Sequence, residues 1–251
     1  MKILIATPMA GWSVGGCHHA SMWPLMRAAK DGSTHEFDII SPRLMVGVDL
    51  VRARSRCVRM FLESNADSLL FVDSDVECNI TALRGMIAED VELIGAAYPK
   101  KRRDEYGPCK EFALHTGNQS CPISGHKASI DAIGMGFVLI KRPLLERMVA
   151  DYDAELGADD DGYRTTMLFM LSFGMNGPKR VLWPEDYSFC QRVRNYTRVW
   201  LYTGPGAPLG HEGHHLYQGK AEHVHPRNVP DIWYENEWFE PGFDDQADGA
   251  P

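Results

Sequence analysis

Short apolar runs alternate with amphipathic segments along the chain, and their order predicts an α/β protein. Continuous apolar runs at 2–7, 69–72 and 93–98 are typical of strands that are buried on both faces of a sheet. Residues 49–64 instead place apolar side chains at helical spacing, and a second helix is expected at 80–89. Strands and helices that alternate in this way build a mostly parallel central sheet flanked by helices.

The alternation continues along the rest of the chain. The further elements expected are a helix near 21–30, strands at 37–40, 181–183 and 199–202, and helices that begin at Pro143 and Pro184. Strand character is also expected over 130–140, interrupted by Gly134-Met135-Gly136. The strand at 37–40 is expected to end at Ser41-Pro42. The acidic run 159–162 lacks the ligand spacing of a calcium loop and is expected to be a turn. We expect one domain over residues 1–240 and a disordered acidic tail at 241–251.

The composition is that of an ordinary soluble protein and narrows the range of partners. The net charge of −8 over 251 residues argues against a general nucleic-acid binder. No window approaches the ~18–20 apolar residues of a membrane span. The six cysteines show no Cys-x-x-Cys spacing, and no export signal precedes them, so we expect reduced thiols in a cytoplasmic protein.

Although the chain is acidic overall, its basic residues are informative at two places. On the helix at 49–64, Arg54 falls among the apolar positions, and a buried arginine needs an anion, either a core carboxylate or a ligand phosphate. Three other arginines lie on the opposite side of this helix and are expected in solvent: Arg52, Arg56 and Arg59. The run Lys100-Lys101-Arg102-Arg103 is either a solvated loop or a site for an anionic partner.

Two carboxylates follow the most apolar of the expected strands. The run Leu69-Leu70-Phe71-Val72 leads directly into Asp73-Ser74-Asp75. Ligands of open α/β sheets bind beyond the carboxyl ends of the strands. In an extended chain both aspartates point to the same side, where their oxygens suit Mg²⁺ or Mn²⁺ held against a phosphate. The alternative is that these acids only cap the helix expected near Asn79.

Five short motifs, taken in order, resemble those of the nucleotide-sugar-dependent glycosyltransferases of the GT-A (Rossmann-like) fold, family 2-like. They are Ala53-Arg54-Ser55, Leu70-Phe71-Val72-Asp73-Ser74-Asp75, Ile133-Gly134-Met135-Gly136-Phe137, Pro184-Glu185-Asp186-Tyr187 and Gly210-His211-Glu212-Gly213. The resemblance covers roughly residues 2–220. It implies a hexosyltransferase that moves a sugar from a nucleotide-sugar donor to an acceptor hydroxyl.

The resemblance assigns a metal to the donor half of the site. Asp75 matches the direct ligand of a Mn²⁺ or Mg²⁺ ion, Asp73 matches a residue near the ribose and the metal, and His211 matches a late metal ligand. His214 or His215 is close enough in sequence to take that last place instead. Such an ion stabilises the charge that develops on the leaving nucleoside diphosphate.

Six further residues are implied to contact the donor: Thr7, Pro8, Arg54, Ser74, Gly134 and Gly136. In this resemblance the first strand ends beside the nucleobase, the arginine pairs with a phosphate or a nearby carboxylate, and the glycines let the backbone approach the sugar. A UDP-sugar is expected from the family alone, because residues 35–45 hold no clear uridine-reading acid except Asp38.

Two acids at the start of a late helix supply the expected catalytic group. Asp186 matches the general base of inverting members, which takes the proton from the acceptor hydroxyl, and Glu185 flanks it to bind acceptor or sugar. Alternatively, both acids only favour the N-terminus of the helix. The base role holds only for inversion of the anomeric configuration, which the sequence leaves open.

The acceptor is expected to be anionic if the run from Lys100 to Arg103 faces it. One candidate is a glycan or cell-surface polymer, and the other is a hydroxymethylated DNA base, as in phage-type DNA glucosylation in a host cytoplasm. A DNA acceptor predicts a steep loss of activity with salt and a target base that is flipped out. A neutral sugar acceptor predicts little salt dependence.

Two other functions compete with sugar transfer. The string His211-Glu212-Gly213-His214-His215 fits the zinc-hydrolase pattern His-Glu-x-x-His, with His211 and His215 as ligands. That pattern requires a helix, and the glycines and proline around it argue against one. The second competitor is a non-catalytic domain that binds a nucleotide sugar.

Overall fold

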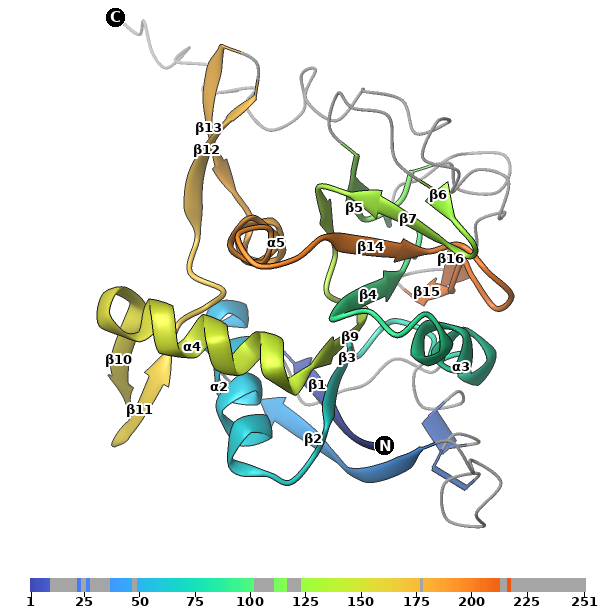
Figure 1. Ribbon diagram of the computed structural model, residues 1–251, viewed down its shortest axis with the longest axis horizontal. Coiled ribbons are helices and arrows are strands. Elements are labelled where there is room, and N and C mark those ends of the chain that lie inside the picture. Colours follow the sequence, from blue (N-terminus) through green and yellow to red (C-terminus); the bar gives the residue numbers. More distant parts are fainter. Residues whose placement is uncertain are drawn as a thin grey trace, which may run out of the picture.

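The computed structural model of the chain describes residues 1–9, 22–23, 26–27, 37–46, 49–101, 111–116, 123–176, 178–212 and 216–217. Within these ranges the protein is an α/β protein in which helices flank a large central sheet (Figure 1). This confirms the fold class predicted from the alternation of apolar runs and amphipathic segments. The expected tail at 241–251 lies outside the described residues, and the domain limits stay a prediction.

The central sheet has eight described strands in the order β2-β1-β3-β9-β4-β14-β7-β6. Their bounds are β1 Lys2–Met9, β2 Asp38–Val46, β3 Ser68–Val72, β4 Leu93–Ala96, β6 Ile123–Ser124, β7 Lys127–Ile130, β9 Phe137–Lys141 and β14 Val199–Tyr202. Strands β7 and β9 run against the other strands of this sheet. The sheet is therefore mostly parallel, and β9 separates β3 from β4.

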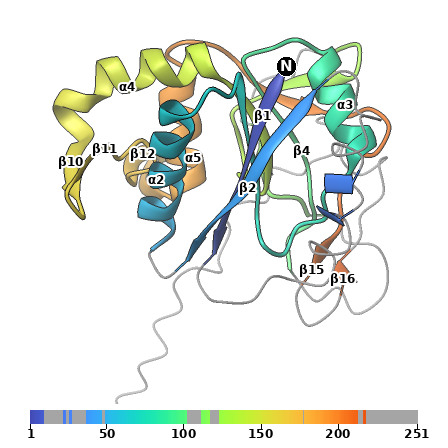
Figure 2. The same ribbon diagram turned by 90° about the horizontal axis from the view of Figure 1, so that it is seen from below.

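Helices cover both faces of the sheet, which explains why its strands are apolar throughout. Three helices pack on one face, and α3 (Ile80–Ala88) packs on the other (Figure 2). The three are α2 (Leu50–Glu63), α4 (Arg142–Leu156) and α5 (Glu185–Val193). Side chains of β3 alternate between the two cores, because Leu69 and Phe71 join the first and Leu70 and Val72 join the second.

Local signals set the helix ends close to their predicted positions. The Asp49 side chain accepts a hydrogen bond from the backbone N–H of Arg52 at 3.0 Å and begins α2. Pro143 lies in the first turn of α4, where its missing N–H removes no helical bond. Only residues 22–23 and 26–27 of the helix expected near 21–30 are described, and they are helical.

The clearest error in an expected strand boundary concerns β2. Strand β2 does not end at Ser41-Pro42 but continues to Val46. It lies at the edge of the sheet, where a proline costs no hydrogen bond to a second neighbour. The register against β1 shifts between Leu4 and Ala6, opposite this dipeptide, so an irregularity absorbs the proline.

The expectation that three α2 arginines lie free in solvent is also wrong. The hairpin of β10 (Gly157–Asp160) and β11 (Tyr163–Thr166) packs beside them. The buried Asp160 accepts hydrogen bonds from Arg56 Nη2 at 2.7 Å and from Arg52 Nη2 at 2.6 Å. Arg59 donates to Thr165 Oγ1 at 3.1 Å and lies over the Tyr163 ring. The turn predicted at 159–162 is confirmed as the turn of this hairpin.

Smaller two-stranded sheets complete the described structure. They are β12 (Ser172–Asn176) with β13 (Lys179–Trp183), β5 (Leu114–His115) with β8 (Ala132–Ile133), and β15 (His211–Glu212) with β16 (Leu216–Tyr217). The described cysteines Cys57, Cys78 and Cys190 are buried. None of the helices in the described ranges has the length and apolar character needed to cross a membrane.

Candidate functional site

The candidate site lies where β3 reaches the edge of the sheet. Asp73 follows directly after Val72, the last residue of β3, and its backbone N–H donates to the Gly136 carbonyl oxygen at 3.0 Å. The antiparallel pairing of β9 with β3 produces this contact, because Val72 lies opposite Phe137. The aspartate motif and the Gly-Met-Gly motif therefore meet, although they are far apart in the sequence.

Asp73 and Asp75 are not the caps of α3. The Asn79 side chain fills that role, since it accepts hydrogen bonds from the backbone N–H groups of Thr81 at 2.9 Å and Ala82 at 3.2 Å. The capping alternative for the two aspartates is therefore wrong.

Arg54 projects from α2 between two carboxylates. Its Nη2 donates to Asp73 Oδ1 at 3.0 Å and to Oδ2 at 2.9 Å, and its Nη1 donates to Glu185 Oε1. Burial would lower the pKa of Arg54, but the charges of Asp73 and Glu185 raise it overall, so the guanidinium stays charged. The prediction of an inward arginine is confirmed, and its partners in the structure are carboxylates. Its buried Nε has no hydrogen-bond partner among the described residues.

Asp186 lies beside this ion-pair cluster at the start of α5. Pro184 precedes the helix, and Glu185 and Asp186 occupy its first turn. Asp186 keeps part of its surface exposed, but burial of its carboxyl together with the charge of Glu185 raises its pKa to about 7. A carboxyl with this pKa changes protonation state near neutral pH, as a general base must.

Asp75 belongs to a second cluster formed with Lys101 and His211. Its Oδ2 pairs with the Lys101 ammonium, and its Oδ1 lies 3.5 Å from His211 Nε2. Burial would raise the pKa of Asp75, but hydrogen bonds from His211 and Lys101 lower it to about 2. The carboxylate is therefore ionised at neutral pH.

The backbone fixes the place and the orientation of His211. The Glu212 N–H donates to the Asp75 carbonyl oxygen at 2.7 Å, so the late loop runs beside the aspartate motif. His211 Nδ1 lies 2.7 Å from the Pro99 carbonyl oxygen. A carbonyl oxygen can only accept, so Nδ1 donates a hydrogen bond to Pro99, and Nε2 is the ring nitrogen that faces Asp75.

Tyr98 connects the two clusters and was not predicted as a site residue. Its hydroxyl accepts a hydrogen bond from the Gly136 N–H at 3.1 Å, and its ring meets the His211 ring edge-on at 5.0 Å between centroids. Burial and the charges of Asp73 and Asp186 raise its pKa well above the usual value, so the phenol stays protonated. Its position at the end of the strand that precedes Pro99 was the available signal.

The two glycines of the Gly-Met-Gly motif leave room for this tyrosine. A Cβ on Gly134 would lie 2.4 Å from the Tyr98 hydroxyl oxygen, and a Cβ on Gly136 would lie 2.7 Å from the Tyr98 ring. Glycine is therefore required at both positions for the Tyr98 ring to pack there. Approach of a donor sugar to these glycines stays a prediction.

The remaining predicted residues fall into three groups. Thr7 is fully buried near the end of β1, and its hydroxyl lacks a hydrogen-bond partner, while Pro8 follows it and Ser74 is half-buried. Lys101 is held by Asp75, and Lys100 lies 4.0 Å from Glu111. Four predicted residues lie outside the described ranges: Arg102, Arg103, His214 and His215.

The described residues contain no ready-made group of three or more His, Cys, Asp or Glu side chains that could hold a metal ion. The reason is visible in the contacts: Asp75 and His211 lie together, whereas Asp73 points to Arg54. The metal site predicted from Asp73, Asp75 and His211 is thus brought together in part.

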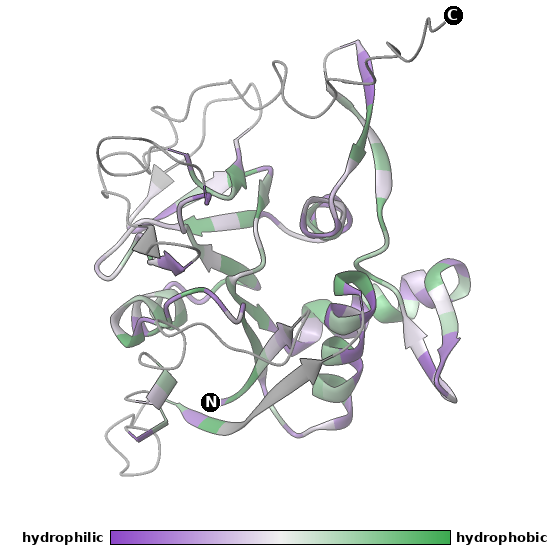
Figure 3. Cartoon of the chain, turned by 180° about the vertical axis from the view of Figure 1, so that it is seen from behind, coloured by the Kyte–Doolittle hydropathy of each residue, from purple (hydrophilic) through white to green (hydrophobic). Residues whose placement is uncertain are grey.

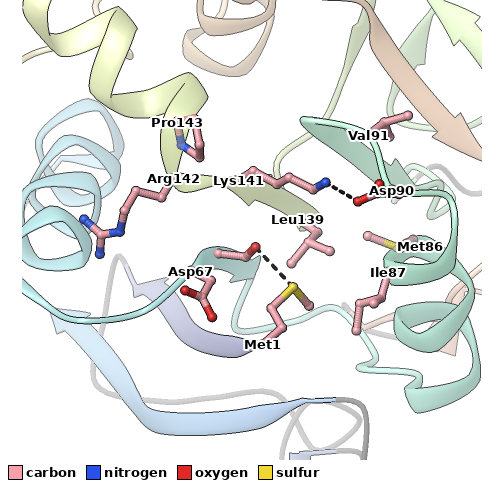
Figure 4. A pocket seen from close by; sticks show the side chains of 11 residues that line it. Met1, Asp67, Met86, Ile87, Asp90, Val91, Leu139, Lys141, Arg142 and Pro143 are labelled. Atoms are coloured by element: carbon pink, nitrogen blue, oxygen red, sulfur yellow. Dashed lines mark hydrogen bonds and ion pairs between the residues drawn. The ribbon is translucent and has the colours of Figure 1, made fainter.

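A cavity of about 370 Å³ lies elsewhere in the molecule (Figure 4). It is lined by Met1 and Ser68 at the starts of β1 and β3, by Lys141 at the end of β9, and by Met86 and Ile87 of α3. These are the strand ends opposite to Asp73 and Gly136. The cavity is therefore separate from the candidate site.

The chain matches no protein-family model and no curated protein. Among solved structures it is similar to A197 from STIV, with 15% identity and a TM-score of 0.49 over 88% of this chain and 95% of that one. It is also similar to a glycosyltransferase involved in the glycosylation of the major capsid of PBCV-1, with 13% identity and a TM-score of 0.30 over 61% and 67% of the two chains. A third is mannose-1-phosphate geranyltransferase from Thermus thermophilus, with 12% identity and a TM-score of 0.40 over 80% and 73%. At these values the likenesses carry no argument about activity.

Proposed function

We propose that the protein is a glycosyltransferase that moves a sugar from a nucleotide-sugar donor, expected to be a UDP-sugar, to an acceptor hydroxyl. One observation carries the proposal: five motifs that are scattered along the sequence converge at one edge of the sheet. There they form two adjacent clusters, one of Arg54, Asp73, Glu185 and Asp186 and the other of Asp75, Lys101 and His211. Sugar transfer needs both a general base and a positive charge at the leaving diphosphate.

Asp186 is the proposed general base. Its raised pKa, about 7, lets it hold the proton of the acceptor hydroxyl during attack on the anomeric carbon. Arg54 fixes Glu185 and Asp73 on either side, so the cluster does not need to reorganise when a substrate binds. This role applies to transfer with inversion.

Asp75 and His211 are the proposed ligands of a Mn²⁺ or Mg²⁺ ion. A carboxylate and an imidazole nitrogen are acceptable donors for Mn²⁺, and the Nδ1–H bond to Pro99 holds the ring with Nε2 toward Asp75. When bound, the ion supplies positive charge to the leaving diphosphate. In the structure Lys101 supplies a positive charge to the same carboxylate, so we infer that the ion and the ammonium compete for Asp75.

The buried polar atoms without partners support a ligand at this edge. The Thr7 hydroxyl and the Arg54 Nε are both buried and unpaired. Unpaired buried donors are costly, and a bound ligand is one way in which they are satisfied. Thr7 is proposed to lie by the nucleobase, with Pro8, Ser74, Gly134 and Gly136 along the donor.

The zinc-hydrolase alternative has no support in the described residues. His211 and Glu212 belong to strand β15, where neighbouring side chains point to opposite faces, whereas the zinc pattern needs a helix. A non-catalytic binding domain would use the same donor site, and only turnover separates it from an enzyme.

A labelled-sugar transfer assay tests the proposal and identifies the acceptor. Nucleotide sugars labelled in the sugar are incubated with glycan acceptors and, separately, with DNA that contains hydroxymethylated bases. Transfer by the wild type and by the surface variant Asp90→Asn, but not by Asp186→Asn, supports the proposal. Transfer to DNA that falls by orders of magnitude between about 50 and 200 mM salt identifies the DNA acceptor. Donor binding without any transfer or hydrolysis would favour the non-catalytic alternative.

A further inference from the structure

The hairpin of β12 and β13 stands away from the body of the protein (Figure 1). In its register Phe173 lies opposite Leu182, and Met175 lies opposite Arg180. Because side chains alternate along a strand, these four residues share one face of the hairpin, called here the outer face.

The outer face is apolar and exposed, whereas the inner face is buried at Trp183 and exposed at Lys179. Phe173 and Met175 are each 62% exposed, and Leu182 is 54% exposed. On the inner face the Trp183 indole fills the space above Gly174, where an added Cβ would lie 1.8 Å from Trp183 Nε1. Trp183 is buried in the core that α2, α4 and α5 share, so the base of the inner face, and not the outer face, packs on the body of the protein.

The charge of this segment has one sign. Residues 167–184 contain no acidic residue, although the chain has 34 of them, and their charged residues are Lys179 and Arg180. The Arg180 guanidinium lies 4.2 Å from the centre of the exposed Phe173 ring. Figure 3 shows green apolar stretches along the hairpin and purple polar colour toward its outer end.

We propose that the outer face binds a lipid bilayer whose surface carries anionic headgroups. Exposed aromatic and aliphatic side chains gain free energy by entering the headgroup boundary. Arg180 on the same face, and Lys179 next to it on the opposite face near the turn, are attracted to anionic lipids. A second copy of the chain is the poorer partner, because two such hairpins would bring four positive charges together with no acid from residues 167–184 to compensate them. This binding goes beyond the proposed sugar transfer and does not depend on it.

Vesicle flotation of the full chain tests the proposal. The probes are vesicles of phosphatidylcholine alone and vesicles that also contain phosphatidylglycerol. We expect binding to the second kind only. The double change Phe173→Ser and Leu182→Ser should weaken it about tenfold or more, because two exposed apolar side chains no longer enter the bilayer. The double change Lys179→Glu and Arg180→Glu should weaken it about tenfold or more through charge.

Matched controls separate the outer face from general surface effects. Trp23→Ser removes an apolar side chain that is 68% exposed on another part of the molecule. Arg198→Glu reverses an exposed arginine that also lies over an aromatic ring, that of Trp200 at 5.8 Å. Both controls should bind vesicles as the wild type does, and thermal unfolding checks that every variant is folded.

Two results would overturn the proposal. One is equal binding by the wild type and both hairpin variants, or no binding to anionic vesicles at all. The other is a dimer of the wild type in light scattering that becomes a monomer in the Phe173/Leu182 variant without any binding to vesicles. That second result would assign the outer face to contact between copies of this chain.

Discussion

Replacing Arg54 by methionine removes the positive charge that lies between two carboxylates of the candidate site. The Arg54 side chain is 3% exposed, and the side chains of Asp73 and Glu185 are 20% and 17% exposed, so water cannot fully replace the guanidinium. Breaking a buried ion pair by removing one partner costs about 3–5 kcal/mol of unfolding free energy. In a domain of this size the loss corresponds to a fall in Tm of about 6–20 °C.

Urea unfolding measures this loss against a matched control. Arg147 pairs with Glu92 at 2.8 Å, but its side chain is 45% exposed. Arg147→Met should therefore cost about 0–1 kcal/mol. Adding Asp73→Asn and Glu185→Gln to Arg54→Met should recover much of the loss, because no buried charge is then left uncompensated. If Arg54→Met costs no more than Arg147→Met, the electrostatic description of the site is wrong.

Three further predictions follow from single contacts. Burial and the Glu185 carboxylate raise the pKa of Asp186 to about 7, so activity should rise as the pH increases through 7. In Glu185→Gln this rise in activity should occur at a lower pH. Lys101→Met should raise the affinity for Mn²⁺ in calorimetry, because the ammonium no longer competes for Asp75. Gly136→Ala should cost about 1–3 kcal/mol in urea unfolding, because the new Cβ overpacks against the buried tyrosine ring.

Each of these predictions has a contrary outcome. If activity rises at the same pH in Glu185→Gln as in the wild type, the Glu185 carboxylate does not affect the titration of Asp186. The control for Lys101→Met is Lys127→Met, which breaks an ion pair with Glu89 at 2.7 Å and should leave the Mn²⁺ affinity unchanged. Equal Mn²⁺ affinity in the wild type and Lys101→Met would show that the ammonium and the ion do not compete for Asp75. A Gly136→Ala variant as stable as the wild type would show that the ring moves freely.

Local patterns predicted the features that depend on nearby residues. The run before Asp73 indicated a strand buried on both faces, and the helical projection placed Arg54 inward, because both follow from the period of the apolar positions. Motif order then associated Asp186 and His211 with the same site. The resemblance supplied this step, since spacing along the sequence does not reveal which strand ends meet.

Contacts between distant segments were beyond this reasoning. Arg52 and Arg56 looked solvated because their partner Asp160 lies more than a hundred residues away in the chain. The pairing of Lys101 with Asp75 depends on β4 and β3 ending at the same edge of the sheet with β9 between them. Strand β12 was missed because Gly174 interrupts its apolar residues, and those residues face outward instead of toward a core.

Metal-linked binding of a nucleoside diphosphate tests the central claim most directly. The experiment titrates UDP into the wild type, Asp75→Ala and the control Asp90→Ala, first with Mn²⁺ and then with EDTA. Asp90 is a matched control because its side chain is 87% exposed and pairs with a lysine at the other end of the sheet. We predict binding that needs Mn²⁺ in the wild type and in Asp90→Ala, and none in Asp75→Ala. Absence of metal-linked binding of UDP, and of GDP, CMP and TDP, to the wild type would contradict the proposed donor site.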